Sequence, residues 1–385
     1  MLIIIVLHMS RESYRFFIVF DYICLDGINS VQNHSIPPCD MKTSEKALTI
    51  SGLVLAAFVA ACRLFRPAAD FYSSRLYPGI SAALSFIASP LECSLQQILT
   101  VAAALLAIVI IVISIWHHRK WYAVLGRLGI LGLWIFVWVY IGWGCNYFRS
   151  SIYERTGTSA EKYDSAKFAA FLEDYIEDLN ESYSDAQNPD LAVMEDNLKN
   201  IYASVPEEFG LCTPKPWQHV KRLLMTRLPS KCGVIGFIGP MTDEAHLSSG
   251  IPAVQFPFSL AHEFSHVLGV SSEAEANWWA YQICRKSSDP AVRYSAQFSI
   301  LGYVLGNAGK NLEKAEYRKL AESIRPEIYK DIDIVSEYWD EQRVPALDKF
   351  QDWIYDLFLK SNSVSEGIAD YSDVVRMLLT LEDFQ

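Results

Sequence analysis

Several features that the sequence lacks narrow its possible functions. None of its eight cysteines forms a CxxC pair, so a structural zinc ribbon is not indicated. Near the N-terminus, no small-residue cleavage site follows a long apolar core, and a secretory signal peptide is therefore not recognisable. Residues 151–385 lack a basic excess, with 22 Lys and Arg against 37 Asp and Glu. A negatively charged surface argues against nucleic acid as a partner.

Charged residues are also missing from three long apolar runs in the first 150 residues. Residues 98–116 and 128–145 contain no Asp, Glu, Lys or Arg, and a shorter run extends from Ala47 to Phe65 if Arg63 reaches out to the interface. Each run is close to the roughly 20 residues that a helix needs to cross a bilayer. The sequence therefore predicts a membrane region, residues 41–150, with transmembrane helices near 47–65, 98–116 and 128–145.

The first forty residues do not fit this pattern. Met1–Leu7 is apolar but too short to span a bilayer, and the next apolar stretch is interrupted by charges. Met41 stands directly before the first transmembrane run. We treat residues 1–40 as an uncertain N-terminal extension, and translation from Met41 as a hypothesis.

The distribution of basic residues predicts how the chain is oriented in the cell membrane. Arg119, Lys120 and Arg127 lie between the second and third apolar runs, where an excess of Lys and Arg favours the cytoplasm. Lys42 and Lys46 agree, although the loop from residue 63 to residue 97 also carries three arginines. We therefore expect a multi-pass protein whose C-terminal region lies outside the cytoplasm.

The strongest functional signal is His262-Glu263-Phe264-Ser265-His266, an HExxH motif. On a helix, positions i and i+4 lie on one face, so both imidazoles can bind one zinc ion. Glu263 is placed to act as general base toward a water molecule at the metal. Gly269 is a natural helix end and Ser272 a natural cap for a second helix, so a tight turn would bring later carboxylates back toward the imidazoles.

Two glutamates compete for the role of third ligand. Glu273 lies four residues before Asn277, so the two share a helix face, and Asn277 could orient a metal ligand by a hydrogen bond. Glu275 lies three residues after Ser272, as in a capping box, which is a structural role. We prefer Glu273 as the ligand and keep Glu275 as the alternative.

The remainder of residues 151–385 reads as a helix-rich domain. Apolar residues recur at helical spacing over 166–179, whereas prolines and glycines separate short apolar runs in 205–257, where we expect a small β-sheet. Weaker site candidates are Glu244 and His246 in this region and, as a donor to an oxyanion, one of the three tyrosines Tyr281, Tyr294 and Tyr303. Of the pair Trp278-Trp279 we expect one ring to be buried and the other partly exposed. The predicted fold class is mainly α.

Three stretches make the chain resemble the DUF3810 family, bacterial multi-pass membrane proteins related to zincin-like peptidases. They are Tyr72–Pro78 with Trp143–Arg149, the HExxH region with Glu273–Asn277 and Arg293–Ser295, and Phe358–Asn362 with Gly367 and Tyr371. The resemblance implies three membrane helices followed by a zincin-like domain, with zinc bound by His262 and His266.

These observations predict a membrane-anchored zinc metallopeptidase that hydrolyses a peptide or protein substrate. One alternative is a zinc-binding sensor or interaction module without catalysis. Glu263 argues against it, since a structural site needs no base. The other alternative is a membrane scaffold in which the motif is accidental.

Overall fold

The structure is a computed structural model, and it describes residues 41–159, 164–185, 190–222, 227–248, 250–362 and 373–381. Residues 1–40, and with them the proposed extension and start-site hypothesis, lie outside the described residues. The same holds for Gly367 and Tyr371 of the third family-like stretch.

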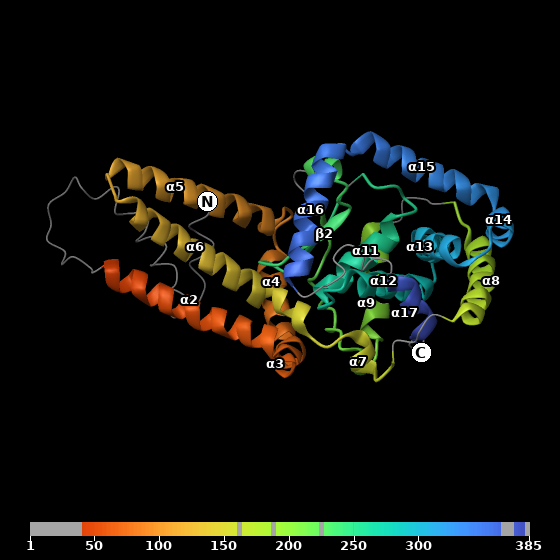
Figure 1. Cartoon of the computed structure of the whole chain (residues 1–385), viewed down its shortest axis with the longest axis horizontal. Coiled ribbons are helices and arrows are strands. Elements are labelled where there is room, and N and C mark those ends of the chain that lie inside the picture. Colours follow the sequence, from red (N-terminus) through yellow and green to blue (C-terminus); the bar gives the residue numbers. More distant parts are fainter. Residues whose placement is uncertain are drawn as a thin grey trace. The chain divides into compact units, whose positions relative to one another are not determined.

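Three long apolar helices confirm the predicted membrane region: α2 (Met41–Leu64), α5 (Leu95–Trp116) and α6 (Trp121–Gly142) (Figure 1). Each is long and apolar enough to cross a bilayer. The third differs from its predicted span of 128–145 at both ends. It starts at Trp121, because Arg127 is accommodated inside the helix by an ion pair of 3.0 Å with Glu45. It ends at Gly142, and the 3-10 helix η4 (Gly144–Phe148) follows.

Between α2 and α5 the chain forms short helical segments that are too short to span. Their bounds are α3 (Arg66–Phe71), the π-helical turn η3 (Tyr72–Leu76) and α4 (Tyr77–Ala88).

The C-terminal region is mainly helical, as predicted. Its helices are α7 (Ile152–Thr156), α8 (Ser165–Ser182), α9 (Leu191–Ala203), η5 (Glu207–Phe209), α10 (Arg227–Lys231), α11 (Phe256–Val267), α12 (Glu273–Arg285), α13 (Pro290–Asn311), α14 (Lys314–Glu322), α15 (Pro326–Gln342), α16 (Pro345–Ser361) and α17 (Val374–Thr380). The periodic apolar residues of α8 face the core, because Phe168, Leu172, Tyr175, Ile176 and Leu179 are all buried.

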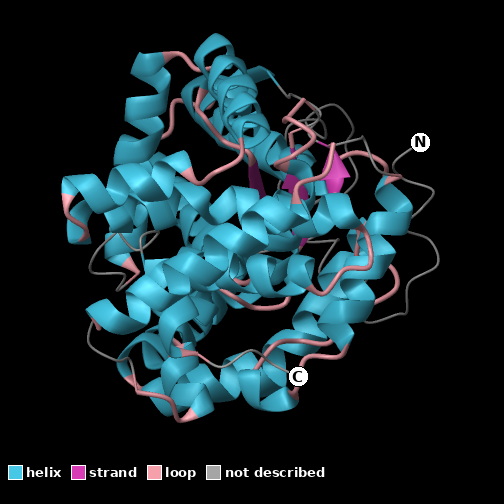
Figure 2. Ribbon diagram, turned by 90° about the vertical axis from the view of Figure 1, so that its right-hand side faces the viewer, coloured by secondary structure: helices cyan, strands magenta, loops and turns pink. Residues whose placement is uncertain are grey.

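The expected small sheet has three short strands, β1 (Lys221–Arg222), β2 (Gly236–Gly239) and β3 (Glu244–Leu247). Their order is β1-β3-β2, with β1 parallel and β2 antiparallel to β3. Figure 2 shows these strands (magenta) among the helices (cyan). β2 therefore lies at an edge of the sheet.

The chain divides into two compact units, and the division does not coincide with the border between the predicted membrane region and residues 151–385. One unit combines residues 103–132 with the chain before Leu53, and the other holds Leu53–Ala102 and Leu133–Gln385. One end of each membrane helix thus belongs to the same unit as the C-terminal region.

Inside the larger unit, the sheet is joined to the start of α5 by a buried carboxylate. Glu244 accepts hydrogen bonds from the backbone N–H groups of Leu95 (3.2 Å) and Gln96 (2.8 Å). Lys221 lies 2.6 Å from the same carboxylate. An anion at a helix N-terminus interacts favourably with the helix dipole, so Glu244 ties β3 to this membrane helix.

One packing expectation is wrong. Trp278 and Trp279 are both fully buried at 0% exposure, with ring centroids 4.7 Å apart. Phe209 packs on both rings, at 6.3 Å and 5.3 Å. α12 runs through the core and is buried on every side from Glu273 to Cys284, which leaves no exposed face for either tryptophan.

Candidate metal centre

The HExxH motif lies on α11, whose bounds have local causes. Pro257 stands in the first turn, where the missing N–H costs nothing and the fixed φ suits a helix. The helix ends before Gly269, which has φ +95°, a conformation that L side chains rarely adopt. Ser272 then caps α12, its hydroxyl accepting from the Glu275 N–H at 3.3 Å. The turn between the two helices brings the start of α12 back against α11.

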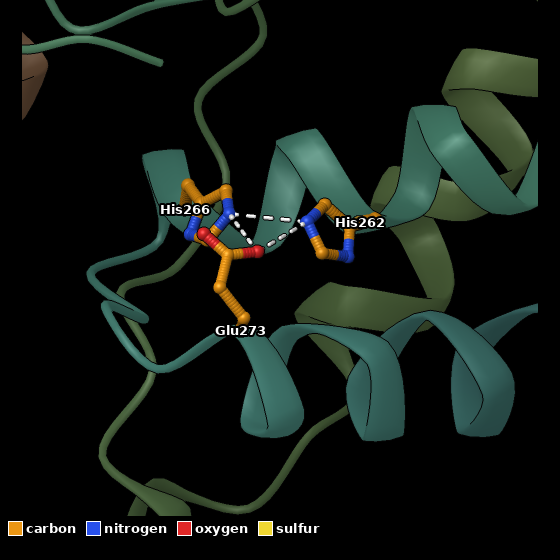
Figure 3. A group of neighbouring side chains, drawn as sticks. All are labelled: His262, His266 and Glu273. Atoms are coloured by element: carbon orange, nitrogen blue, oxygen red, sulfur yellow. Dashed lines mark hydrogen bonds and ion pairs between the residues drawn. The ribbon is translucent and has the colours of Figure 1, made fainter. Parts of the chain in front are cut away.

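Three side chains from these two helices meet at one point (Figure 3). The Nε2 atoms of His262 and His266 are 3.2 Å apart, and Oε2 of Glu273 lies 3.1 Å from the first and 3.7 Å from the second. His266 and Glu273 are buried, while 14% of the His262 side chain remains exposed. Among the described residues, this is the one group of His, Cys, Asp and Glu that could hold a metal ion.

Hydrogen bonds on the far side of each ring set the tautomers. Nδ1 of His266 lies 2.7 Å from the carbonyl oxygen of Val270, which can only accept, so this nitrogen carries the proton. Nδ1 of His262 lies 2.9 Å from Oδ1 of Asn277, whose amide nitrogen faces the Tyr303 hydroxyl at 3.5 Å. Both neutral rings therefore direct an Nε2 lone pair at the carboxylate and at each other. Three acceptors facing one another require a cation between them.

Without a metal, a proton can fill this role. Burial alone would lower the pKa of His266, but the Glu273 carboxylate outweighs burial and raises it to about 9. Glu273 shows the reverse effect: burial opposes ionisation, yet the two imidazoles hold its pKa well below the usual range.

Glu275, the alternative ligand, points away from this cluster. Its Oε1 atom binds the guanidinium groups of Arg149, at 3.3 Å, and of Arg155. It also accepts from the indole N–H of Trp279 at 3.3 Å. Burial alone would raise the pKa of Glu275, but Arg155 and Arg149 hold it below its ordinary value. Glu275 anchors α12 to the segment after α6, and the geometry leaves Glu273 as the carboxylate beside the histidines.

Glu263 is buried, and its Oε2 atom has no hydrogen-bond partner among the described residues. Burial raises its pKa to about 7, although His262 and His266 act in the opposite direction. The edge strand β2 packs directly on this carboxylate, since a Cβ atom added to Gly236 would lie 2.6 Å from Glu263 Oε1. Only glycine leaves room for the carboxylate at this position.

Residues near the membrane helices contact the cluster, and the sequence reasoning did not identify them. Trp143, directly after α6, donates its indole N–H to the His266 carbonyl at 2.8 Å and packs edge-on against the His266 ring. Tyr77 of α4 donates to the Val267 carbonyl at 2.8 Å, and its hydroxyl oxygen also lies 2.8 Å from the Asp243 carboxyl group. Burial, followed by the charge of Glu273, raises the pKa of Tyr147. These contacts join positions more than a hundred residues apart, which no local pattern indicates.

The weaker sequence candidates lie mostly elsewhere. Glu244 is engaged with α5 and Lys221, and His246 is fully buried against the Phe237 ring. Of the three tyrosines, Tyr281 bonds to Gln297 and Tyr294 to Asp331, whereas Tyr303 lies beside Asn277. Burial, and next the charge of Glu273, raises the Tyr303 pKa.

Comparison with known proteins agrees with the resemblance seen in the sequence. The profile of a family described as "Protein of unknown function (DUF3810)" matches residues 72–379, which is most of the chain. The chain belongs to the DUF3810 family. The DUF3810 match begins in η3 and includes α4, α5 and α6 as well as the His262 cluster. Neither a curated protein nor a solved structure matches the chain.

Proposed function

We propose that this protein is a membrane-anchored, zinc-dependent metallopeptidase. The observation that carries the proposal is the set of three acceptor atoms, from His262, His266 and Glu273, that face one another in a buried position. Their separations of 3.1, 3.2 and 3.7 Å are close to the value of about 3.3 Å that ligands of a tetrahedral zinc ion have, given bonds near 2.05 Å.

The number and type of ligands favour catalysis over a structural role. Structural zinc sites usually close all four positions with protein ligands, whereas catalytic sites use three and leave the fourth open. Two imidazoles and one carboxylate form a known catalytic set. A zinc ion held here would supply Lewis-acid chemistry, polarising a carbonyl group and acidifying water.

The protein residues would carry out the proton transfers. Glu263 follows the first ligand on α11, and its unpaired carboxylate oxygen can accept a proton from the attacking water. Glu263 would then return this proton to the departing amine. Asn277 and Val270 hold the two imidazoles in the tautomer that presents Nε2, so they position the ligands and take no part in bond breaking.

The sheet offers a position for an extended peptide. β2 is an edge strand, and its Gly236 packs on Glu263. A substrate segment that added to this edge by main-chain hydrogen bonds would run past the general base.

We also propose that the site lies on the extracytoplasmic side of the cell membrane. The site packs against Trp143 at the end of α6, while the other end of this helix adjoins Arg119 and Lys120. Basic residues between two membrane helices favour the cytoplasm, which places the opposite helix end outside. Cleavage of the C-terminal region by protease added to intact cells would support this orientation.

The test is hydrolysis by the purified full chain in detergent, loaded with zinc and compared with its Glu263→Gln variant. A mixture of peptides from a digested, denatured protein serves as the substrate, and mass spectrometry identifies new ends. We expect the variant to retain zinc and to lose hydrolysis by a factor of about 100 to 10,000, the usual contribution of a general base. Glu327→Gln, at a partly exposed carboxylate in α15, is the control and should hydrolyse as the wild type does.

The outcomes separate the candidate functions. Equal hydrolysis by wild type and Glu263→Gln would contradict the mechanism. Zinc bound without any hydrolysis would favour the sensor or interaction module.

A further inference from the structure

The short helix α4 has an inverted distribution of polar and apolar residues. Its buried face carries the polar groups: Tyr77, Ser81 and Ser85 are 0%, 2% and 5% exposed. Its outer face carries the large apolar side chains, with Phe86 60% and Ile87 57% exposed. A helix on a water-soluble surface has the opposite arrangement, with its apolar stripe toward the core.

The inner polar face is fully engaged with the protein. Ser81 donates to the Asp243 carboxylate and accepts from the Gln218 amide at 3.1 Å. Ser85 accepts from the indole N–H of Trp217 at 3.3 Å. These bonds fix the rotation of α4 about its axis, so Phe86 and Ile87 cannot turn inward.

The outer face continues the surface of the membrane helices. α4 is separated from α5 by a short turn, and its Leu84 side chain would lie 3.6 Å from a Cβ at Gly142, the last residue of α6. Large apolar side chains are exposed on the adjoining segments too: Leu64 (74%), Phe65 (64%), Phe71 (55%) and Ile98 (43%). From Tyr77 to Ala88 the sequence contains no Asp, Glu, Lys or Arg, whereas Arg75 precedes this stretch and Glu92 follows it.

We propose that the outer face of α4 is embedded in the lipid bilayer, as a fourth membrane element that does not cross it. Twelve residues of helix extend about 18 Å, which is well short of the hydrocarbon thickness of about 30 Å. α4 therefore lies in the interfacial layer, where the apolar face of such a helix enters the acyl-chain boundary. Trp217, whose ring packs edge-on against Phe86 at 5.4 Å, has the position of an interfacial tryptophan.

This placement brings the metal centre to the membrane surface. Tyr77, on the inner face of α4, donates to the carbonyl of Val267, the residue after His266. A helix with its side chains is about 10–12 Å thick, so His266 would lie little more than one helix diameter from lipid. On the proposed function, the cleaved bond would then belong to a segment close to the bilayer, such as the membrane-proximal part of an anchored protein.

Photo-crosslinking of the full chain in phosphatidylcholine–phosphatidylglycerol vesicles tests the placement. Benzoylphenylalanine is introduced at Phe86 and, in a second variant, at Ile87. Two positions of matched exposure serve as controls: Leu105 in α5 and Ile334 in α15, each 56% exposed. Mass spectrometry then measures covalent lipid adducts.

We expect adduct yields at Phe86 and Ile87 to be close to that at Leu105 and on the order of tenfold above that at Ile334, because only the first three would contact acyl chains. Yields equal to that at Ile334, or crosslinks to a protein chain in place of lipid, would overturn the proposal. Lipid crosslinking requires neither zinc nor hydrolysis. A negative crosslinking result would therefore not contradict the proposed peptidase activity, and absence of hydrolysis would not contradict the lipid contact of α4.

Discussion

Replacing Glu273 and Glu275 one at a time should separate a metal ligand from a structural anion. Glu273 and Glu275 are two positions apart in α12, so their side chains leave the helix on nearly opposite sides, and both are buried. Glu273 faces the two imidazoles, while Glu275 faces Arg149 and Arg155. Substitution by Gln removes the charge and preserves the shape in both cases.

Glu275→Gln should destabilise the protein strongly. It leaves two guanidinium groups, with side chains only 6% and 12% exposed, without their anion. Removing one partner of a buried ion pair costs about 3–5 kcal/mol, which corresponds to a fall in Tm on the order of 10 °C for a unit of this size. Zinc binding should persist, so added zinc should still raise the Tm of this variant.

Glu273→Gln should instead abolish the zinc effect. At a zinc concentration 100 times Kd, binding stabilises the wild type by about 2.7 kcal/mol. Loss of a group that only orients a metal ligand weakens binding by up to about 100-fold, and we assume at least this loss for a direct ligand. At the same zinc concentration, binding then stabilises the variant by only about 0.4 kcal/mol. The zinc-dependent rise in Tm should then nearly disappear.

The assay is thermal unfolding of the full chain in detergent, with and without zinc, for the wild type and both variants. Glu327→Gln, at a partly exposed carboxylate in α15, controls for loss of a carboxylate as such and should behave as the wild type. A zinc-dependent Tm rise that survives in Glu273→Gln but vanishes in Glu275→Gln would refute the assignment of Glu273 as third ligand.

Three further predictions concern the same site. Asn277→Ala should weaken zinc binding by a factor of about 10 to 100, measured by competition with a chelating dye, because His262 loses the hydrogen bond that fixes its tautomer; unchanged affinity would contradict this role. Gly236→Ala should reduce hydrolysis while retaining zinc, because the new Cβ would lie 2.6 Å from Glu263 Oε1 and 2.6 Å from the His246 carbonyl oxygen of β3. Full activity would contradict this close packing of β2 on the carboxylate. Because a proton on His266, with a pKa of about 9, competes with zinc, apparent zinc affinity should increase about tenfold per pH unit between pH 6 and pH 8. A flat dependence in a chelator titration would contradict this competition.

The sequence predicted the features that depend on local periodicity and on missing charge. HExxH spacing placed both histidines on one face of α11, and Gly269 with Ser272 predicted the turn into α12. The three membrane helices were predicted from long apolar runs without charged residues. The start of α6 was placed too late, because Arg127 was taken to end the run and its ion-pair partner Glu45 is far away in the sequence.

Features that depend on long-range packing were not accessible. The choice between Glu273 and Glu275 stayed open because the partners of Glu275, Arg149 and Arg155, precede it by more than a hundred residues. The burial of both Trp278 and Trp279 depends on Phe209 and on the central position of α12. The inverted polarity of α4 was likewise visible only once its buried face was known.

We propose that His262, His266 and Glu273 hold one zinc ion. The most direct test measures zinc per chain in the purified full-length protein, together with His262→Ala and the matched control His117→Ala in the exposed connection between α5 and α6. We expect close to one zinc per chain in the wild type and in the control, and little or none in His262→Ala. A folded wild-type protein that binds no zinc, or a His262→Ala variant that keeps it, would contradict zinc binding at this site.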